Sequence, residues 1–317
     1  MKITEHLAKA NKTVFSFEIL PPLKGQSIHQ LFNAVEPLME FKPAFIDVTY
    51  HREEYVYKQQ PNGLLEQKIT RKRPGTVGIC AAIMNRYGID AVPHLICGGF
   101  SKEETENALI DLDFLGIDNV LVLRGDAIKT EGKFVPDENG HHYASELLQQ
   151  VVKMNQGIYM DEDLQKTSPT EFCIGVAGYP EKHFEAPNLD KDLEYLKLKV
   201  ELGAQYIVTQ MFFDNNKFFE FVRRCRAIGI QVPIIPGLKP ITVKNQMTIL
   251  PSIFHIDLPN ELVKEIDKCK DNQAVTQVGI EWGIQQSKEL MDFGVPCLHY
   301  YSMSRSVAVQ NIAKALF

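Results

Sequence analysis

An arginine, a glycine and an aspartate directly follow an apolar run in the first half of the chain. The run spans 120–123, and Arg124, Gly125 and Asp126 come immediately after it. Four consecutive apolar residues are typical of a strand that is buried on both faces of a parallel sheet. A cation and a carboxylate at the carboxyl end of such a strand lie where α/β folds bind ligands. A solvated Arg124 and a capping Asp126 explain this stretch equally well, so both interpretations stay open for it alone.

Eight strand-like segments alternate with helix-like segments and would position these residues and others like them. The expected strands span 14–20, 44–50, 91–97, 120–124, 172–177, 206–210, 232–237 and 297–301. The expected helices span 27–40, 75–87, 101–115, from 143, 190–202, 216–227, 243–291 with breaks near Pro251 and Pro259, and from 305. A polar loop is expected over 51–73, with a turn at 61–63. This alternation without a domain break predicts the α/β class, as one (β/α)₈ TIM barrel over 1–317.

In such a barrel every strand-to-helix loop lies on one face, and several expected strands end in polar residues. These are Glu18, Thr49, His94, Arg124, Asp126, Gln210 and Arg305. Seven polar side chains around one mouth predict a catalytic or ligand-binding site better than they predict independent solvated residues. Asp192 and Lys199 lie seven positions apart, so they would share one helix face. That spacing alone favours an ordinary solvated face.

The composition excludes several classes of function. The 317 residues carry a formal net charge of -6, which argues against a nucleic-acid partner, and the basic cluster over 68–73 is local. We find no run of 18 apolar residues and no leader-like start, so we expect no membrane association. The six scattered cysteines contain no CxxC pair. We therefore expect reduced thiols in a cytoplasmic protein, and no metal site.

The strand ends resemble those of the methylenetetrahydrofolate reductase family, flavoproteins that make 5-methyltetrahydrofolate. The matching segments occur in the family's order and cover nearly the whole chain. They are Phe17-Glu18 with Pro21-Pro22, Asp47-Val48-Thr49-Tyr50, Pro93-His94-Leu95, Leu123-Arg124-Gly125-Asp126, Tyr143-Ala144-Ser145, Ala177-Gly178-Tyr179-Pro180-Glu181 with His183, Thr209-Gln210 with Phe212-Phe213-Asp214, and Ile235-Pro236-Gly237. Each segment alone is a weak match, whereas their joint occurrence is specific to the family's catalytic barrel.

This resemblance implies that FAD binds at the carboxyl ends of the strands. No GxGxxG motif follows a strand, so the resemblance alone supplies the cofactor. The implied contacts are Thr49, Tyr50, His94, Leu123, Arg124, Gly125, Asp126, Tyr143, Ala144, Tyr179, His183, Ala186, Asp192 and Lys199. Their chemistry suits a dinucleotide, because Arg124, His183 and Lys199 can offset the charge of a pyrophosphate.

The resemblance also implies the reaction, which is reduction of 5,10-methylenetetrahydrofolate to 5-methyltetrahydrofolate by NAD(P)H. Hydride would pass in ping-pong order through flavin N5, and the product would supply methyl groups for methionine synthesis. Glu18 and Asp126 resemble the family's catalytic acids: Glu18 the general acid for N10, Asp126 the acid beside the flavin's pyrimidine end. The implied substrate contacts are Glu18, Asp126, Gln210, Gln246, Tyr301 and Arg305. The choice between NADH and NADPH stays open.

Three residues depart from the pattern of some relatives. Tyr195 stands in place of an asparagine and Leu198 in place of a basic residue, while Leu250 stands where an aromatic ring would stack on substrate. The chain ends after the barrel, so we do not expect the regulatory domain of longer eukaryotic members. We do expect a homo-oligomer, of a size that the sequence does not determine.

Two alternatives to this reductase remain open. One is a flavin-dependent barrel with another substrate, similar to proline dehydrogenase, and Glu18 beside Pro21 and Pro22 argues against it. The other is a folate-binding module without catalysis, which the intact Glu18, Asp126 and Gln210 disfavour.

Overall fold

Parallel strands form the centre of the computed structural model, which describes residues 1–127, 132–303 and 305–317. In sheet order they are β10 (Gly237–Leu238), β11 (Cys297–Met303), β1 (Val14–Ile19), β2 (Phe45–Val48), β5 (Asp90–Ile96), β6 (Asn119–Leu123), β7 (Cys173–Gly178), β8 (Tyr206–Thr209) and β9 (Ile234–Ile235). Only Pro236, which has no N–H, separates β9 from β10. These two halves share one strand position, which pairs with β8 on one side and β11 on the other. Eight positions therefore close the predicted (β/α)₈ barrel.

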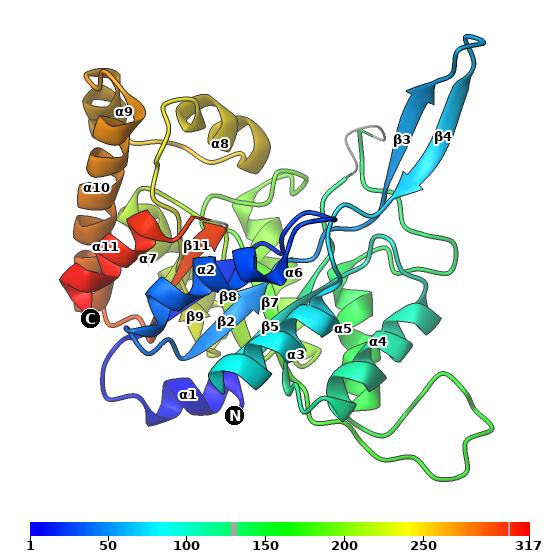
Figure 1. Ribbon diagram of the computed structural model, residues 1–317. Coiled ribbons are helices and arrows are strands. Elements are labelled where there is room, and N and C mark those ends of the chain that lie inside the picture. The colour runs from blue at the N-terminus through cyan, green and yellow to red at the C-terminus, as the bar shows by residue number, and fades with distance from the viewer. Residues whose placement is uncertain (128–131, 304) are drawn as a thin grey trace.

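Helices cover the outside of the barrel (Figure 1). They are α2 (Ile28–Met39), α3 (Thr76–Tyr87), α4 (Lys102–Phe114), α5 (Ala144–Met154), α6 (Leu189–Glu201), α7 (Asn215–Ala227), α10 (Asn272–Asp292) and α11 (Val307–Leu316), while α8 (Gln246–Phe254) and α9 (Asn260–Asp267) precede α10. The expected break at Pro251 is wrong, because α8 continues through this residue and ends at His255, whose φ is 54°. The helix α4 begins with a complete capping box between Ser101 and Glu104.

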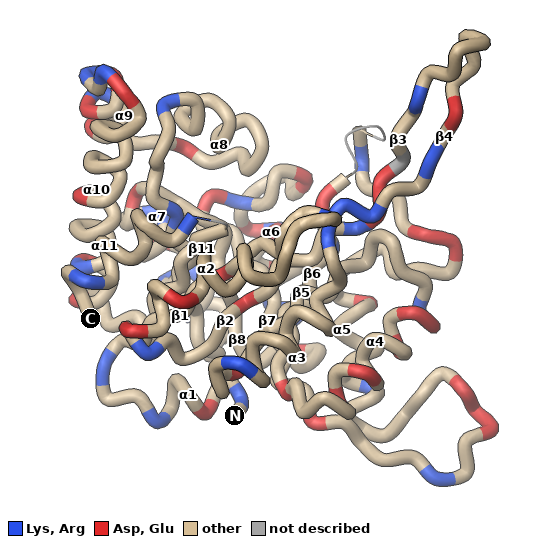
Figure 2. Tube along the Cα trace, viewed as in Figure 1, with Lys and Arg blue, Asp and Glu red and all other residues tan. Residues whose placement is uncertain are grey.

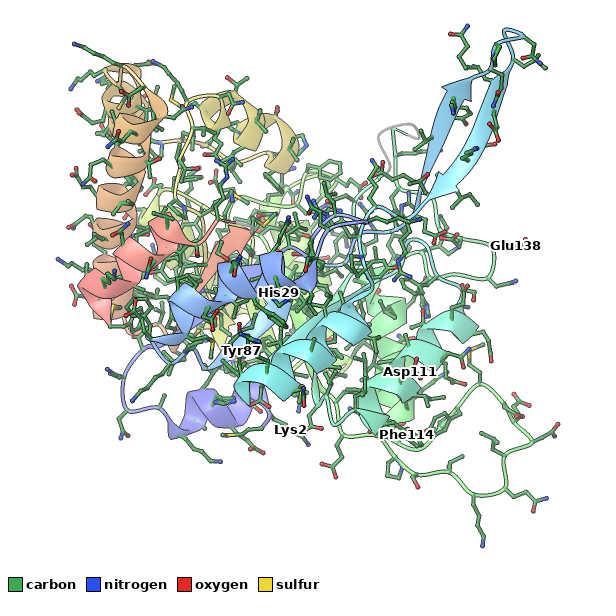
Figure 3. The ribbon with its side chains drawn as sticks, in the orientation of Figure 1. Lys2, His29, Tyr87, Asp111, Phe114 and Glu138 are labelled. Carbon is green, nitrogen blue, oxygen red and sulfur yellow. The ribbon has the colours of Figure 1, made fainter. Side chains whose placement is uncertain are left out.

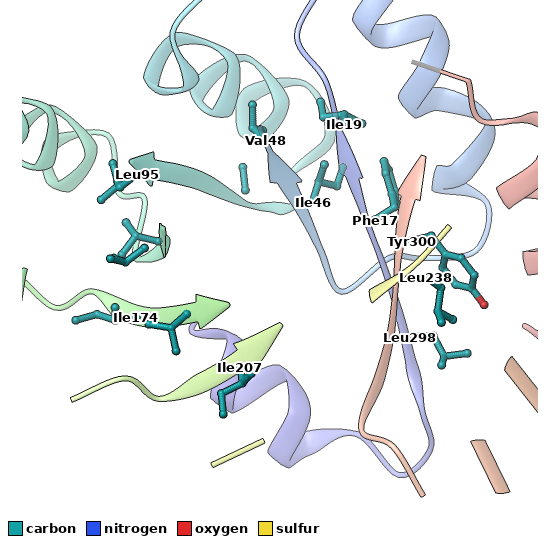
Figure 4. Packing of buried hydrophobic residues seen from close by; sticks show 14 of the residues in the cluster. Phe17, Ile19, Ile46, Val48, Leu95, Ile174, Ile207, Leu238, Leu298 and Tyr300 are labelled. Atoms are coloured by element: carbon teal, nitrogen blue, oxygen red, sulfur yellow. The ribbon is translucent and has the colours of Figure 1, made fainter. Parts of the chain in front are cut away.

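Apolar side chains fill both faces of the strands. The outer layer joins the strands to the helices and includes Phe17, Ile46 and Tyr300 (Figure 4). The inner layer fills the bottom of the barrel with a second cluster, in which the Tyr206 ring lies against Gly175 where any Cβ would clash. Burial on both faces explains why the strands read as continuous apolar runs.

A short amino-terminal helix, α1 (Ile3–Lys9), closes the bottom of the barrel and was not expected from the sequence. Ile3 is fully buried in the inner cluster, and its backbone N–H donates to Asn119 Oδ1 at 2.8 Å. With the bottom filled and covered in this way, the open mouth lies at the carboxyl ends of the strands, as in other TIM barrels.

The segment expected to be a loop over 51–73 instead contains an antiparallel hairpin that projects from the barrel (Figure 1). Its strands are β3 (Glu54–Gln59) and β4 (Leu65–Thr70), and Gly63, with a φ of 82°, lies in the expected turn. The hairpin was missed because most of its side chains face solvent, which removes the apolar alternation that marks a half-buried strand. Charges of both signs line it (Figure 2), and Lys72 pairs with Glu54.

Among the described residues, no helix combines the length and apolar character needed to cross a bilayer. The most exposed large apolar side chain, Phe114, projects at the carboxyl end of α4, far from the hairpin (Figure 3). Five of the six cysteines are buried, as a core role for these thiols predicts.

Candidate active site

Three titratable side chains meet inside the barrel below the mouth, and we call them the carboxylate cluster: Glu18, Asp47 and His94. Side chains alternate along β1, so Phe17 and Ile19 face the helices while Glu18 faces inward. The strand register pairs Glu18 with Asp47 on β2, and β5 brings in His94. All three are buried, with exposed fractions of 6%, 0% and 5%. Groups that prefer water therefore share a dry interior.

The distances within the carboxylate cluster are short. His94 Nε2 lies 3.6 Å from Glu18 Oε2 and 3.5 Å from Asp47 Oδ2. The Thr49 hydroxyl donates to Glu18 Oε1 at 2.6 Å and fixes the orientation of that carboxyl group. Both Asp47 oxygens and His94 Nε2 lack a hydrogen-bond partner among the described residues. Buried polar groups normally find partners, so this unused capacity marks a site built for more than stability.

The charge environment favours a protonated His94. Burial alone lowers the pKa of this imidazole, but the nearby carboxylates of Glu18 and Asp47 outweigh burial and raise the pKa above its ordinary value. Beneath it, His299 on β11 accepts or donates through Nδ1 to Ser16 Oγ at 2.9 Å. Burial lowers the pKa of His299, so the two neighbouring imidazoles differ in their readiness to carry charge.

Another part of the mouth is rich in cations, and we call Arg124, Lys182, His183 and Lys199 the cation cluster. Arg124 extends β6 and forms an ion pair with Glu185. Lys199 Nζ donates to the Ala177 backbone oxygen at 2.8 Å. Burial lowers the pKa of Lys199 to about 8, although Asp192 opposes this, and burial with Arg124 lowers the pKa of His183 to about 4. This region therefore favours negative charge in whatever occupies it.

The backbone around the cation cluster is shaped by two side chains and one glycine. Asp192 Oδ2 accepts from the His183 backbone N–H at 2.9 Å, and the Tyr179 ring lies edge-on to the His183 ring at 4.8 Å. Gly125 has a φ of 85°, a conformation that other residues rarely adopt, and its neighbour Ile96 lies close. Asp192 and Lys199 thus face the same strand end, rather than solvent alone.

Known proteins resemble this chain over nearly its whole length. The family model for methylenetetrahydrofolate reductase matches residues 2–317. A Schizosaccharomyces pombe methylenetetrahydrofolate reductase is 31% identical over the whole chain, which covers 48% of that protein. A Pectobacterium carotovorum 5,10-methylenetetrahydrofolate reductase is 30% identical, over 92% of this chain and 86% of that protein.

The chain belongs to the methylenetetrahydrofolate reductase family. It spans about half the length of the fungal, plant and nematode relatives and most of the length of the bacterial ones. A solved Clostridium thermocellum protein, described as binding two copies of 5-methyl-5,6,7,8-tetrahydrofolic acid, superposes with a TM-score of 0.59 over 99% of this chain and 97% of that chain. At 12% identity this likeness shows the fold alone.

The residues that the family resemblance implies as flavin contacts lie at several positions around the mouth. The Thr49 hydroxyl donates to Glu18, and His94 is a member of the carboxylate cluster. Tyr50 packs on Phe100 with ring centroids 5.0 Å apart. Tyr143 is largely exposed before α5, whereas Ala186 is buried and its carbonyl accepts from Lys182 Nζ at 2.8 Å. The remaining positions in this set are Leu123 and Ala144, both partly buried, and Asp126, which is exposed.

The expected substrate contacts differ in the hydrogen bonds that they already make within the chain. Gln246 Oε1 accepts from the backbone N–H groups of Thr242 and Val243, so this side chain holds the turn before α8. Gln210 Oε1 accepts from its neighbour Met211 at 2.9 Å. The exposed Arg305 follows β11, so its side chain is at the rim.

Tyr301 is the substrate candidate most firmly built into the barrel. Its hydroxyl donates to the Thr209 backbone oxygen at 2.6 Å and crosses the face of Gly237, where a Cβ would collide with both groups. Gly237 itself donates to Thr209 Oγ1 at 3.0 Å. This glycine therefore allows β10 to approach Tyr301 closely.

The three residues that depart from the pattern of some relatives differ in their burial. Leu250 is buried in a small separate core with Ile241 and Leu262, so this side chain lies on the buried face of α8. Tyr195 and Leu198 are about half exposed on α6.

Sequence reasoning missed two residues of this site, Asp47 and His299. Asp47 lies in a segment that resembles the family but had no predicted role, and His299 had none either. A signal was present for both, because they are the polar interruptions of otherwise apolar or aromatic strands. Their shared interior position follows from the strand register, which the sequence does not display.

Proposed function

We propose that this protein reduces 5,10-methylenetetrahydrofolate to 5-methyltetrahydrofolate with NAD(P)H, using FAD, and that the product supplies methyl groups for methionine synthesis. Family membership over residues 2–317 supports the substrate, and the names of a maize and a nematode relative, which specify NADH and NADPH, support a nicotinamide cosubstrate. The observation that carries the proposal is the buried Glu18 carboxyl, oriented by Thr49 at the mouth of the barrel.

The cation cluster fits the pyrophosphate of FAD. Lys199 has three N–H donors, and the contact with Ala177 uses one of them. Arg124 and His183 add donors at the same strand ends, and Asp192 can accept from ribose or ribityl hydroxyls. Gly125, with a φ of 85°, lets the chain turn between Arg124 and Asp126 while it packs closely on Ile96. When bound there, FAD would supply the hydride-transfer chemistry that links the nicotinamide to the one-carbon unit of the folate.

Glu18 is the proposed general acid. Opening the imidazolidine ring of the substrate requires a proton on N10, and the ring-opened 5-iminium cation then accepts the hydride. Thr49 holds Glu18 Oε1, while Oε2 faces His94 at 3.6 Å. The raised pKa of His94 keeps a second proton beside the carboxyl group, and Asp47 balances its charge. The chain thus supplies a proton donor with a protonated neighbour in a water-poor pocket.

The test begins with the colour and the FAD content of the purified protein. We expect a yellow protein with about one FAD per chain, because the cation cluster offers a fixed site for a dianion. Stopped-flow absorbance should then show reduction by NADH or NADPH and reoxidation by 5,10-methylenetetrahydrofolate. A colourless protein that fails to take up added FAD would contradict the proposal, as would a flavin that proline reduces but this folate does not reoxidise.

A further inference from the structure

The hairpin formed by β3 and β4 projects from the barrel as a separate two-stranded sheet (Figure 1). Among the residues that the structure describes, these two strands pair only with each other, so each has an open edge. A lone two-stranded hairpin is only marginally stable in water, and an open strand edge can accept a strand of another chain. A further strand would therefore stabilise this hairpin.

The two faces of the hairpin differ in character. Leu65 and Ile69 of β4 lie on one face, where their exposed fractions are 67% and 63%. The register places Tyr57 of β3, which is 53% exposed, on the same face. The opposite face carries Glu66 and Lys68, whose charged groups lie 3.3 Å apart. A strand added to β4 must therefore match an apolar face and a charged face at once.

The backbone of β4 presents three residues to its open edge. Across the turn, the Gln60 N–H donates to the Leu64 backbone oxygen at 2.8 Å, and this bond fixes the phase of the ladder between the strands. Along an antiparallel strand, successive residues direct their N–H and C=O groups alternately towards the partner strand and away from it. Leu65, Gln67 and Ile69 therefore direct these groups away from β3, where an added strand would meet them.

We propose that β4 pairs with β4 of a second copy of this chain, antiparallel about a two-fold axis through Gln67. In this register Leu65 of each copy lies opposite Ile69 of the other, and Gln67 lies opposite its own counterpart. All three are hydrogen-bonded pairs, because these residues direct their backbone groups outwards. Glu66 of each copy lies opposite Lys68 of the other, in the non-hydrogen-bonded pairs whose side chains approach most closely.

The charges of β4 favour this register over its neighbours. The phase of the ladder allows slips of two residues, and these place either Glu66 opposite Glu66 or Lys68 opposite Lys68, which is destabilising. A lysine on an open edge ordinarily discourages pairing, but here one register matches it with a carboxylate. A surface that complements itself in this way is typical of a two-fold dimer, which is why we assign it to a second copy rather than to another protein.

The first test measures the dimer dissociation constant of the full-length protein by analytical ultracentrifugation. Gln67→Pro removes the central outward N–H, and an edge strand tolerates proline where its N–H faces solvent, so the hairpin should persist. We expect the dissociation constant to rise at least about tenfold, because two hydrogen bonds between the copies are lost. Gln59→Pro makes the same change at the open edge of β3 and should leave the dimer intact.

The second test exchanges charges. In Glu66→Lys and in Lys68→Glu, two like-charge contacts replace two ion pairs, so each variant alone should dimerise roughly tenfold more weakly or worse. An equimolar mixture of the two variants should recover the affinity, because each copy then meets the opposite charge. Glu66→Lys also loses a hydrogen bond from Gln60 within its own chain, and mixing does not restore this bond. Recovery in the mixture therefore assigns the effect to charges across the two-fold axis.

Three results would overturn the inference. One is an unmodified chain that stays monomeric up to its highest soluble concentration. Another is equal weakening by Gln59→Pro and Gln67→Pro, or no weakening by either, which would place the interface elsewhere. The third is a mixture of the charge variants that associates no better than each variant alone. None of these results bears on the proposed function, because the hairpin contributes no member of the carboxylate cluster or the cation cluster.

Discussion

Two histidines at the mouth of this barrel have pKa values that move in opposite directions. His94 lies between Glu18 and Asp47, and their charges raise its pKa despite burial. Burial lowers the pKa of His183 to about 4, with the positive charges of Arg124 and the neighbouring lysines adding to the effect. Burial lowers the pKa of both side chains, so the difference in direction comes from the sign of the neighbouring charges.

This contrast separates two tasks within one mouth. The carboxylate cluster raises the pKa of His94 beside Glu18, which suits acid catalysis at the substrate. The cation cluster keeps His183 neutral and presents positive charge from Lys199 and Arg124, which suits an anionic cofactor. If the two regions have these separate roles, a substitution in one should affect one measurement and spare the other.

The largest separation is expected for Glu18→Gln, which keeps the shape of the side chain but removes the acidic proton. Flavin reoxidation by 5,10-methylenetetrahydrofolate should slow by ~10²–10⁴-fold, as is typical when a general acid is lost. FAD binding and flavin reduction by NAD(P)H should stay near normal, because neither needs a proton on N10. Stopped-flow absorbance of the flavin measures both half-reactions in one sample.

Glu66→Gln, on the exposed hairpin, is the matched control and should change neither half-reaction. Equal slowing of both half-reactions in Glu18→Gln would mean that Glu18 positions the cofactor. Normal rates in both would assign the proton to another donor.

The next effect is expected for Lys199→Met, on the opposite side of the comparison. The loss of a charge-assisted hydrogen bond, worth about 1.5–3 kcal/mol, should weaken FAD binding by roughly 10–100-fold. Because burial lowers the pKa of Lys199 to about 8, the charged form destabilises the FAD-free fold below that pH. At pH 7 the FAD-free variant should therefore melt at a temperature no lower than that of the FAD-free unmodified chain. Any advantage of the variant in melting temperature should shrink as pH rises from 8 to 10.

Lys197→Met provides the control on the same helix, since Lys197 is exposed and pairs with Glu201 on the surface. It should leave FAD affinity, measured by flavin fluorescence, unchanged. An equal loss of affinity in both variants would assign the effect to the helix rather than to the cation cluster.

The sequence predicted the barrel but not which side chains meet inside it. The strands were recognisable because both of their faces are buried, which produces apolar runs such as 120–123. The pairing of Asp47 with Glu18 depends on register, and His94 reaches both from a strand that follows a 17-residue hairpin, Glu54–Thr70. A local sequence pattern does not predict that these three side chains lie together.

Other features were missed for different physical reasons. The hairpin lacks a buried face, and α1 is only seven residues long, too short to show a clear apolar period. Leu250 stands where an aromatic ring of some relatives would stack on substrate, and the packing of α8 places this leucine in a core.

A smaller effect is expected for Asp126→Asn, because Asp126 is exposed and water screens its charge. If Asp126 lies beside the flavin, as the family resemblance implies, its carboxylate opposes negative charge on the reduced flavin, and its removal should raise the flavin reduction potential by roughly 20–40 mV. Hydride transfer to the folate should slow accordingly. A redox titration measures the potential, and Glu138→Gln, in the same loop, is the control. An unchanged potential in Asp126→Asn rejects the electrostatic role.

The smallest effects are expected in the titration midpoints of the two histidines. NMR of the FAD-free protein measures them directly, with signals assigned from His94→Gln and His183→Gln. We expect His94 to titrate above about 6.5 and His183 near 4. Asp47→Asn should lower the His94 midpoint and leave His183 unchanged. Glu185→Gln should lower the His183 midpoint further, because Glu185 raises it, and leave His94 unchanged.

The same shifts set the sign of two stability changes with pH. The pKa of His94 is raised on folding, so its stabilising contribution is complete below about pH 6.5 and is lost as pH rises through the folded value. The pKa of His183 is lowered, so the unfolded chain takes up this proton first, and stability falls as pH decreases from about 6.5 towards 4. His94→Gln should therefore be most destabilising at acidic pH, and His183→Gln should relieve part of the acid sensitivity. Urea unfolding at pH 5 and pH 8 measures both, and equal pH dependence in the two variants would mean that the opposite charge environments do not act on these imidazoles.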